Sequence, residues 1–119
     1  MKTKNLGQLG ENLALQHLKN NGYRILNRNF SSKLGEIDII AIDSSTLVFV
    51  EVKTRWSSSF GSPEEAITPW KIRKIIKTGE YFCLLHPRLP KDLRLDAVVI
   101  DLDNEDKIKR IEIIKNLTG

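Results

Sequence analysis

Cysteine is nearly absent from this sequence of 119 residues, in which Cys83 is the only one. A single cysteine cannot form a disulfide within the chain, so we expect a reducing compartment and a cytoplasmic location. The two histidines are far apart in the sequence and have no second cysteine to join them, so a zinc site is not expected.

Long hydrophobic runs are also missing. The longest apolar runs cover residues 39–42 and 47–50 and are far shorter than the roughly 20 residues that span a bilayer. The amino-terminal residues 1–5 carry positive charge but no apolar stretch follows them, so neither a secretory signal nor a membrane partner is expected. With 40% hydrophobic and 29% charged residues, the composition and length predict one globular domain over residues 1–119.

Positive charge is concentrated in one segment. Residues 69–94 contain seven basic and two acidic side chains, a net charge of +5, whereas the remainder of the chain carries −1. A local basic segment on a nearly neutral body is typical of a protein that binds a polyanion such as nucleic acid. A helix face that is charged only because it meets solvent is the alternative interpretation.

The periodicity of apolar residues predicts a mixed α/β domain with about five strands and flanking helices. We expect helices over residues 6–21 and 69–86, and strands over residues 24–30, 36–43, 46–53, 93–102 and 107–115.

Particular residues also predict where a helix starts and which side of each helix packs on the rest of the domain. Thr68 and Pro69 form a strong helix start, because threonine caps free amides and proline suits the first helical position. In the first helix, a stripe of small residues that includes Gly10 and Ala14 predicts close approach to a sheet. We expect the apolar side of the second helix to consist of Ile72, Ile75, Ile76, Gly79 and Cys83.

The hairpin between residues 36 and 53 carries the most informative charges. With a turn of two or four residues, the numbers of paired positions sum to 89. Asp38 then lies across from Glu51, and Glu36 lies across from Lys53, all on one face of an otherwise apolar pair of strands. Buried charges without partners are unfavourable, so this cluster requires an explanation.

Two explanations fit the cluster. In the first, Lys53 pairs with Glu36, and water solvates Asp38 and Glu51 at the strand ends. In the second, a divalent cation lies between Asp38 and Glu51, whose hard oxygen atoms suit Mg²⁺ or Mn²⁺. Lys53 would then orient a water molecule or stabilise charge on a phosphoryl group.

The spacing Ile37-Asp38, twelve residues, Glu51-Val52-Lys53 resembles the PD-(D/E)xK signature of the restriction-endonuclease-like nucleases, with Ile37 where the signature has proline. The flanking motifs resemble the YraN family of small bacterial proteins over roughly residues 7–102. These motifs are GQLGENLA at 7–14, GEIDII at 35–40, FVEVKTR at 49–55, GSPEEA at 61–66 and RLDAV at 94–98.

This resemblance implies a restriction-endonuclease-like mixed sheet with a central β-hairpin, related to archaeal-type Holliday junction resolvases. It implies that Asp38, Glu51 and the backbone carbonyl of Val52 hold Mg²⁺ or Mn²⁺, that Lys53 acts on the attacking water, and that Glu11 is an added metal ligand among the catalytic residues. A homodimer is implied by the same analogy with resolvases.

Glu11 has independent support from the residues. It shares a helical stripe with Leu15 and Leu18, so we expect it to face inward. A glutamate in the first turn that complements the helix dipole is the alternative.

The resulting functional hypothesis is a metal-dependent nuclease that hydrolyses DNA, with branched or structured DNA as the substrate class. The alternatives are a nucleic-acid-binding module without catalysis and a protein-interaction subunit with a relic site. The residues expected to contact nucleic acid are Arg55, Lys71, Lys74 and Lys77. Arg55 has the alternative of pairing with acids of the next loop.

Three aromatic residues flank the serine-rich loop after the hairpin: Trp56, Phe60 and Trp70. They suit either stacking on splayed bases or packing in the core, and packing is the more common use of aromatic side chains.

Overall fold

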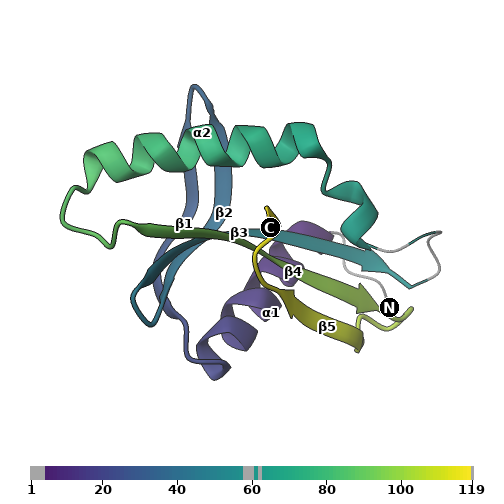
Figure 1. Cartoon of the computed structure of the whole chain (residues 1–119). Coiled ribbons are helices and arrows are strands. Elements are labelled where there is room, and N and C mark those ends of the chain that lie inside the picture. The colour runs from purple at the N-terminus through teal and green to yellow at the C-terminus, as the bar shows by residue number, and fades with distance from the viewer. Residues whose placement is uncertain (1–4, 58–60, 62, 119) are drawn as a thin grey trace.

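The computed structural model describes residues 5–57, 61 and 63–118. Among these residues, five strands form one mixed sheet in chain order, in which β3 and β4 are parallel and the other neighbours are antiparallel. One helix covers each face of the sheet (Figure 1). The expected mixed sheet with a central hairpin and flanking helices is confirmed. The elements are α1 (Leu6–Asn20), β1 (Arg24–Ser32), β2 (Gly35–Asp43), β3 (Thr46–Trp56), the 3-10 helix η1 (Pro63–Ala66), α2 (Pro69–Leu85), β4 (Asp92–Leu102) and β5 (Ile108–Ile114).

The helix boundaries follow from local hydrogen bonding. The Asn5 side chain accepts a hydrogen bond from the Gln8 amide at 2.9 Å at the start of α1, and Gly22 with φ +88° follows its end. At the start of α2, Thr68 Oγ1 accepts from the Lys71 amide at 3.2 Å and Pro69 occupies the first turn. The predicted Thr68-Pro69 start is confirmed. None of the helices in the described ranges is long and apolar enough to cross a membrane.

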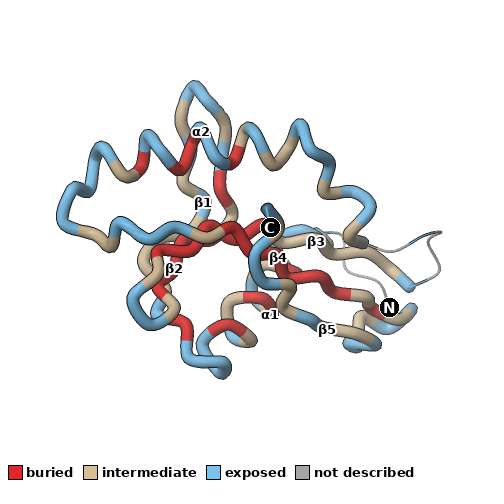
Figure 2. The backbone as a smooth tube through the Cα atoms, in the orientation of Figure 1, coloured by how far each residue is buried: buried red, intermediate tan, exposed pale blue. Residues whose placement is uncertain are grey.

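Two apolar clusters fill the space between the sheet and the helices. Buried residues are concentrated in the central strands (Figure 2). On the α1 side, Ala14 and Leu18 pack against the valines of β3. Gly10 is buried where α1 crosses β3, and a Cβ added there would overlap the side chain of Thr54. The expected close approach of this helix is confirmed.

The buried face of α2 is rotated from the predicted one. Ile75, Gly79 and Phe82 are buried, but Ile76 is 40% exposed and was wrongly placed in the core. Gly79 packs directly on the Phe49 ring, where a Cβ would clash. This contact fixes the rotation of α2 and turns Ile76 toward solvent.

The register of the central hairpin is as predicted, but the β2–β3 pairing ends earlier than predicted. Ile39 pairs with Val50 and Ile40 with Phe49, so paired numbers sum to 89. The pairing ends at Ile39 and Val50, and Glu36 pairs with Ser31 of β1 instead of facing Lys53. Beyond this point β2 continues against β1 and β3 continues beside β4. The expected cross-strand pairs of Glu36 with Lys53 and of Asp38 with Glu51 are therefore absent from the β2–β3 pairing, because the two strands diverge.

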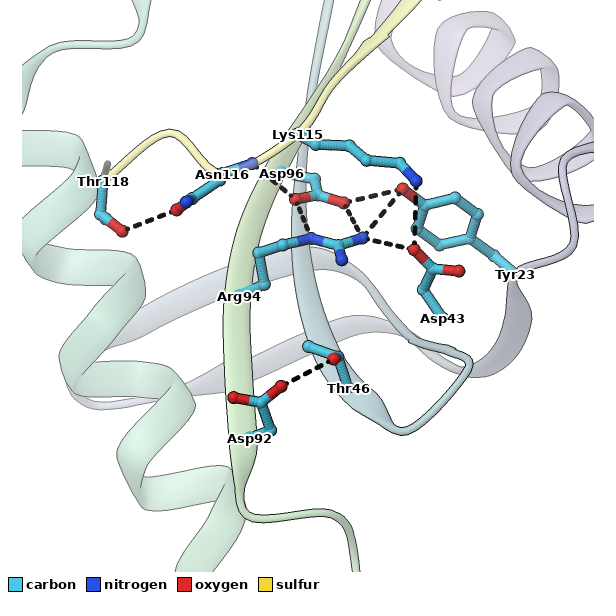
Figure 3. A network of polar contacts seen from close by, with 9 residues as sticks. All are labelled: Tyr23, Asp43, Thr46, Asp92, Arg94, Asp96, Lys115, Asn116 and Thr118. Atoms are coloured by element: carbon cyan, nitrogen blue, oxygen red, sulfur yellow. Dashed lines mark hydrogen bonds and ion pairs between the residues drawn. The ribbon is translucent and has the colours of Figure 1, made fainter.

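A polar network ties the C-terminal segment to the sheet (Figure 3). Asp96 on β4 is 0% exposed and accepts hydrogen bonds from the Tyr23 hydroxyl at 2.8 Å and from the Asn116 amide at 3.0 Å. The Arg94 guanidinium donates to both Asp96 oxygen atoms at 2.8 and 2.9 Å and to Asp43 at 2.7 Å. Every oxygen atom of the buried carboxylate thus has a hydrogen-bond donor.

Candidate active site

Asp38 lies at the point where β2 and β3 diverge. Its Oδ2 atom accepts a hydrogen bond of 2.8 Å from the backbone amide of Val52 on β3. A side chain of β2 thus binds an amide of β3 just beyond the last pair of the β2–β3 pairing. The Asp38 carboxylate is therefore held between the two diverging strands.

Glu51 on β3 is close to Asp38 and only 8% exposed. Burial and then the negative charge of Asp38 raise the pKa of Glu51 to about 7, although the Lys71 and Lys53 ammonium groups act against the shift. Lys71 approaches from α2, with its Nζ 3.7 Å from Glu51 Oε2. A buried carboxyl group next to a half-buried one is costly unless a proton or a cation offsets their negative charges.

Glu11 of α1 approaches Asp38 from the other face of the sheet. A cavity of about 210 Å³ is lined by Glu11, Asp38, Val52 and Lys53, together with Gly7 and Thr54. Burial, followed by the negative charge of Asp38, raises the pKa of Glu11. The expectation that Glu11 faces inward is confirmed, and the close approach of α1 at Gly10 places it there.

Residues of β1 position the Glu11 carboxylate. Asn29 has φ +54° and, in the amide orientation that satisfies both groups, donates to the two Glu11 oxygen atoms at 3.0 and 3.2 Å. Arg28 Nη2 lies 4.0 Å from Glu11 Oε1. Sequence reasoning missed both residues, and the only signal was an asparagine within a strand, a residue that tolerates positive φ.

The oxygen donors at the divergence suit a divalent cation. In the ranges that the structure describes, no three His, Cys, Asp or Glu side chains form a ready-made metal cluster, as Glu11 and Glu51 approach Asp38 from opposite faces. Asp38 and Glu51 remain as an adjacent pair, and Mg²⁺ typically takes one or two carboxylates and several water molecules. The residues therefore fit such an ion, with Lys53 as a cation beside them.

Comparison with known proteins gives the family. A family model described as uncharacterised protein family UPF0102 matches residues 10–100 of the chain. The chain belongs to the UPF0102 family. This result confirms the YraN-like resemblance of the sequence motifs.

Bacterial UPF0102 proteins are similar to the chain over most of its length. One from Persephonella marina is 48% identical over 103 residues, which cover 87% of this chain and 89% of the relative. One from Caldicellulosiruptor bescii is 46% identical over 117 residues, or 98% of each chain, and one from Clostridium botulinum is 44% identical over 116 residues, or 95% of this chain and 93% of the relative. These descriptions name no activity, so the chemistry of the site carries the functional argument.

The basic residues expected to contact nucleic acid lie in different settings in this UPF0102 chain. Lys71 is beside Glu51, and Lys74 Nζ lies 4.7 Å above the ring centroid of Trp70. Lys77 is exposed further along α2. Arg55 is half-buried and donates from Nε to Asp101 of β4 at 2.9 Å, and its positive charge also contributes to lowering the pKa of Glu64, an acid that follows the loop after β3.

The three aromatic residues also separate. Trp56 packs against the α1-side cluster and donates from Nε1 to Asp106 at 3.1 Å, as expected of a packing residue. Trp70 is 61% exposed at the start of α2. Phe60 lies outside the described residues.

Proposed function

We propose that this UPF0102 protein is a metal-dependent nuclease that hydrolyses DNA phosphodiester bonds. The observation that carries the proposal is the carboxyl pair of half-buried Asp38 and buried Glu51 at the divergence of β2 and β3, with Lys53 beside it. A nucleic-acid-binding module needs only basic residues. Placing a buried acid next to a half-buried one destabilises the folded protein, and binding alone gives no reason for it.

Asp38, Glu51 and the Val52 carbonyl are the groups that we propose as holders of Mg²⁺ or Mn²⁺, with Glu11 as the additional carboxylate from α1. When bound, such an ion supplies positive charge that polarises the phosphodiester and lowers the pKa of a water molecule. The Val52 amide fixes the orientation of the Asp38 carboxylate.

Lys53 has a different role from the carboxylates. Its ammonium group carries three N–H donors at the cavity that Asp38 and Glu11 line, so it can orient a water molecule toward phosphorus. It can also stabilise the negative charge that develops on the phosphoryl oxygen atoms. Lys71 adds positive charge on the α2 side, where it offsets the charge of Glu51.

The proposal is tested by cleavage of labelled single-stranded, duplex, flap, fork and four-way-junction DNA with Mg²⁺, Mn²⁺ or EDTA. We expect metal-dependent products that Glu51→Ala reduces to background and that Lys53→Ala reduces about 100-fold or more, the usual scale for a general acid–base group. Glu105→Ala and Lys109→Ala serve as controls because both residues are exposed and neither lines the cavity at Asp38. The panel also tells whether branched DNA is preferred.

Two results would contradict the proposal. Cleavage that persists in purified Glu51→Ala protein would remove the acid pair from the reaction. Salt-sensitive binding by the folded wild type without cleavage of any substrate would favour the nucleic-acid-binding module instead.

A further inference from the structure

A second cavity lies on the α2 side of the sheet, beside the carboxylates but not part of the site described above. It has a volume of about 290 Å³ between the turn that joins β1 to β2 and the start of α2. Its lining includes Ser31, Ser32 and Glu36 from the strands and Trp70, Lys71 and Lys74 from the helix.

Trp70 is the unusual member of this lining. An aromatic side chain that is 61% exposed gains little from burial, in contrast to Trp56, which packs on the core. The Lys74 ammonium group lies 4.7 Å from the centroid of the Trp70 ring. This ammonium group lies over one face of the indole, so a nucleotide base can stack on the opposite face while its phosphate meets the positive charge of the lysines.

The cavity adjoins the carboxyl pair through Lys71. This residue lines the cavity and places its Nζ 3.7 Å from Glu51 Oε2. Glu36 is a second link, because it lines the same cavity and its charge acts on Glu11. A DNA strand whose phosphate lies at Asp38 and Glu51 therefore places a neighbouring nucleotide near Trp70.

The size and chemistry of the cavity favour an unpaired nucleotide. Its volume is at the lower limit of small-ligand pockets, so it suits one nucleotide and not a duplex. Bases inside a duplex are stacked on each other and do not offer a face to an indole ring, whereas unpaired bases do. The hydroxyls of Ser31 and Ser32 and the carboxylate of Glu36 are hydrogen-bonding groups for the edge of such a base.

We propose that this cavity is a subsite for one unpaired nucleotide next to the scissile phosphate, with the base stacked on Trp70 and the backbone held by Lys71 and Lys74. The inference rests on the proposed nuclease function and narrows its substrate to single-stranded DNA or to branched DNA with an unpaired strand at the point of cleavage.

Binding measurements in EDTA test the subsite apart from catalysis. The probes are a single-stranded oligonucleotide, a flap and a blunt duplex of the same sequence. Loss of one base–aromatic stack of roughly 1–3 kcal/mol predicts that Trp70→Ala weakens binding of the single strand and the flap by about 5- to 150-fold. We expect little change for the duplex and retention of most affinity by Trp70→Phe.

Matched variants on the same helix serve as controls. Leu84 is 79% exposed near the end of α2, and Arg73 is an exposed cation outside the cavity lining. Leu84→Ala and Arg73→Ala should leave the discrimination between single strand and duplex intact, whereas Lys74→Ala should weaken it. Because Trp70 is exposed, its substitution should not affect folding, which thermal unfolding can verify.

The outcomes distinguish the subsite from the nuclease. If Trp70→Ala binds every probe as the wild type does, or loses affinity equally for the duplex and the single strand, the subsite is wrong. If Trp70 sets single-strand binding but the wild type cleaves nothing, the subsite stands and the nuclease proposal fails. If Glu51 is required for cleavage, Trp70→Ala should raise KM on the flap with kcat largely kept, and an unchanged KM would overturn the subsite alone.

Discussion

Glu51 is the residue at which burial and charge conflict most directly. Its carboxyl group has a pKa of about 7 in the folded protein, against an ordinary value of 4.5, because it is buried beside Asp38. Below about pH 4.5, both the folded and the unfolded chains hold the proton, so Glu51 does not change stability. Between pH 4.5 and 7 the unfolded chain releases the proton and the folded chain keeps it, so stability falls as pH rises.

The variant Glu51→Gln should therefore stabilise the metal-free protein at neutral and alkaline pH. The shift corresponds to up to about 3 kcal/mol, since one pKa unit is worth about 1.4 kcal/mol. The glutamine amide can also donate to Asp38, where the charged wild-type group cannot. Urea unfolding in EDTA from pH 4 to 9 measures the difference, which should be near zero at pH 4 and reach its full size above pH 7.

The matched control is Glu105→Gln, which neutralises an exposed carboxylate in the turn before β5. Its stability should follow that of the wild type across the same pH range. A Glu51→Gln protein less stable than the wild type at pH 8 would contradict the assignment of an unfavourable buried charge.

At the level of elements, the sequence predicts the helices and strands because each leaves a local signal. Thr68 and Pro69 mark the start of α2, and the alternation around residues 36–53 sets the hairpin register at Ile39 and Val50. The rotation of α2 depends instead on the contact of Gly79 with Phe49, two residues far apart in the chain. The pattern of apolar residues within the helix carries no information about that contact, so Ile76 was wrongly predicted to be buried.

The divergence of β2 and β3 could not be predicted from the sequence pattern either. Strand alternation continues through residues 36–53, which predicts continuous pairing. In the structure the Asp38 side chain takes the Val52 amide, and β3 continues beside β4 instead. The sequence thus identified the charged residues but placed Glu36 and Lys53 opposite each other, where the strands have already separated.

The contact of α1 with β3 predicts opposite changes in stability when Gly10 and Gly7, both in α1, are replaced by alanine. Gly10→Ala should destabilise the protein by roughly 1–3 kcal/mol, because the new Cβ overlaps the stiff side chain of Thr54 and overpacking outweighs the gain in helix propensity. Gly7→Ala should be neutral or stabilising, since Gly7 is exposed and a Cβ there meets only Asn5 Oδ1 at 4.0 Å. Denaturant unfolding of both variants measures the contrast.

The reason for the clash can be checked by relieving it. Thr54→Ala combined with Gly10→Ala should recover part of the lost stability, because Oγ1 and Cγ2 of Thr54 are then absent and only its Cβ, 2.7 Å from the new Cβ, remains. Failure of the second substitution to recover any stability would show that the close approach at Thr54 does not set the position of α1. Since Glu11 follows Gly10, Gly10→Ala should also impair the activity proposed for the cavity.

At the scale of the whole molecule, the candidate site combines residues from both faces of the sheet. Glu11 comes from α1 and Lys71 from α2, and Asp38 lies between them at the strand divergence. The sequence named these residues through the charge pattern and the YraN resemblance. It could not place Lys71 beside Glu51 or Trp70 beside a cavity, because both positions depend on how α2 lies across the sheet.

The network around Asp96 links β4, the hairpin end and the C-terminal segment, so its loss should lower the stability of the whole fold. Arg94→Met removes the guanidinium that donates to both oxygen atoms of this buried carboxylate. An uncompensated buried charge typically costs 3–5 kcal/mol, so we expect destabilisation of about that size in urea unfolding. Hydrogen exchange of the Asn116 and Leu117 amides should quicken, because they bond to Asp96 and to the Leu95 carbonyl.

The double variant Arg94→Met with Asp96→Leu separates charge from packing. Replacing both partners of a buried ion pair by apolar side chains is often close to neutral, so much of the loss should be recovered. Arg55→Met is the comparison at the pair with Asp101, whose carboxylate is 14% exposed where that of Asp96 is fully buried, so we expect a smaller effect. If the double variant is as unstable as Arg94→Met alone, the network contributes through its hydrogen bonds to Tyr23 and Asn116, and not mainly by neutralising Asp96.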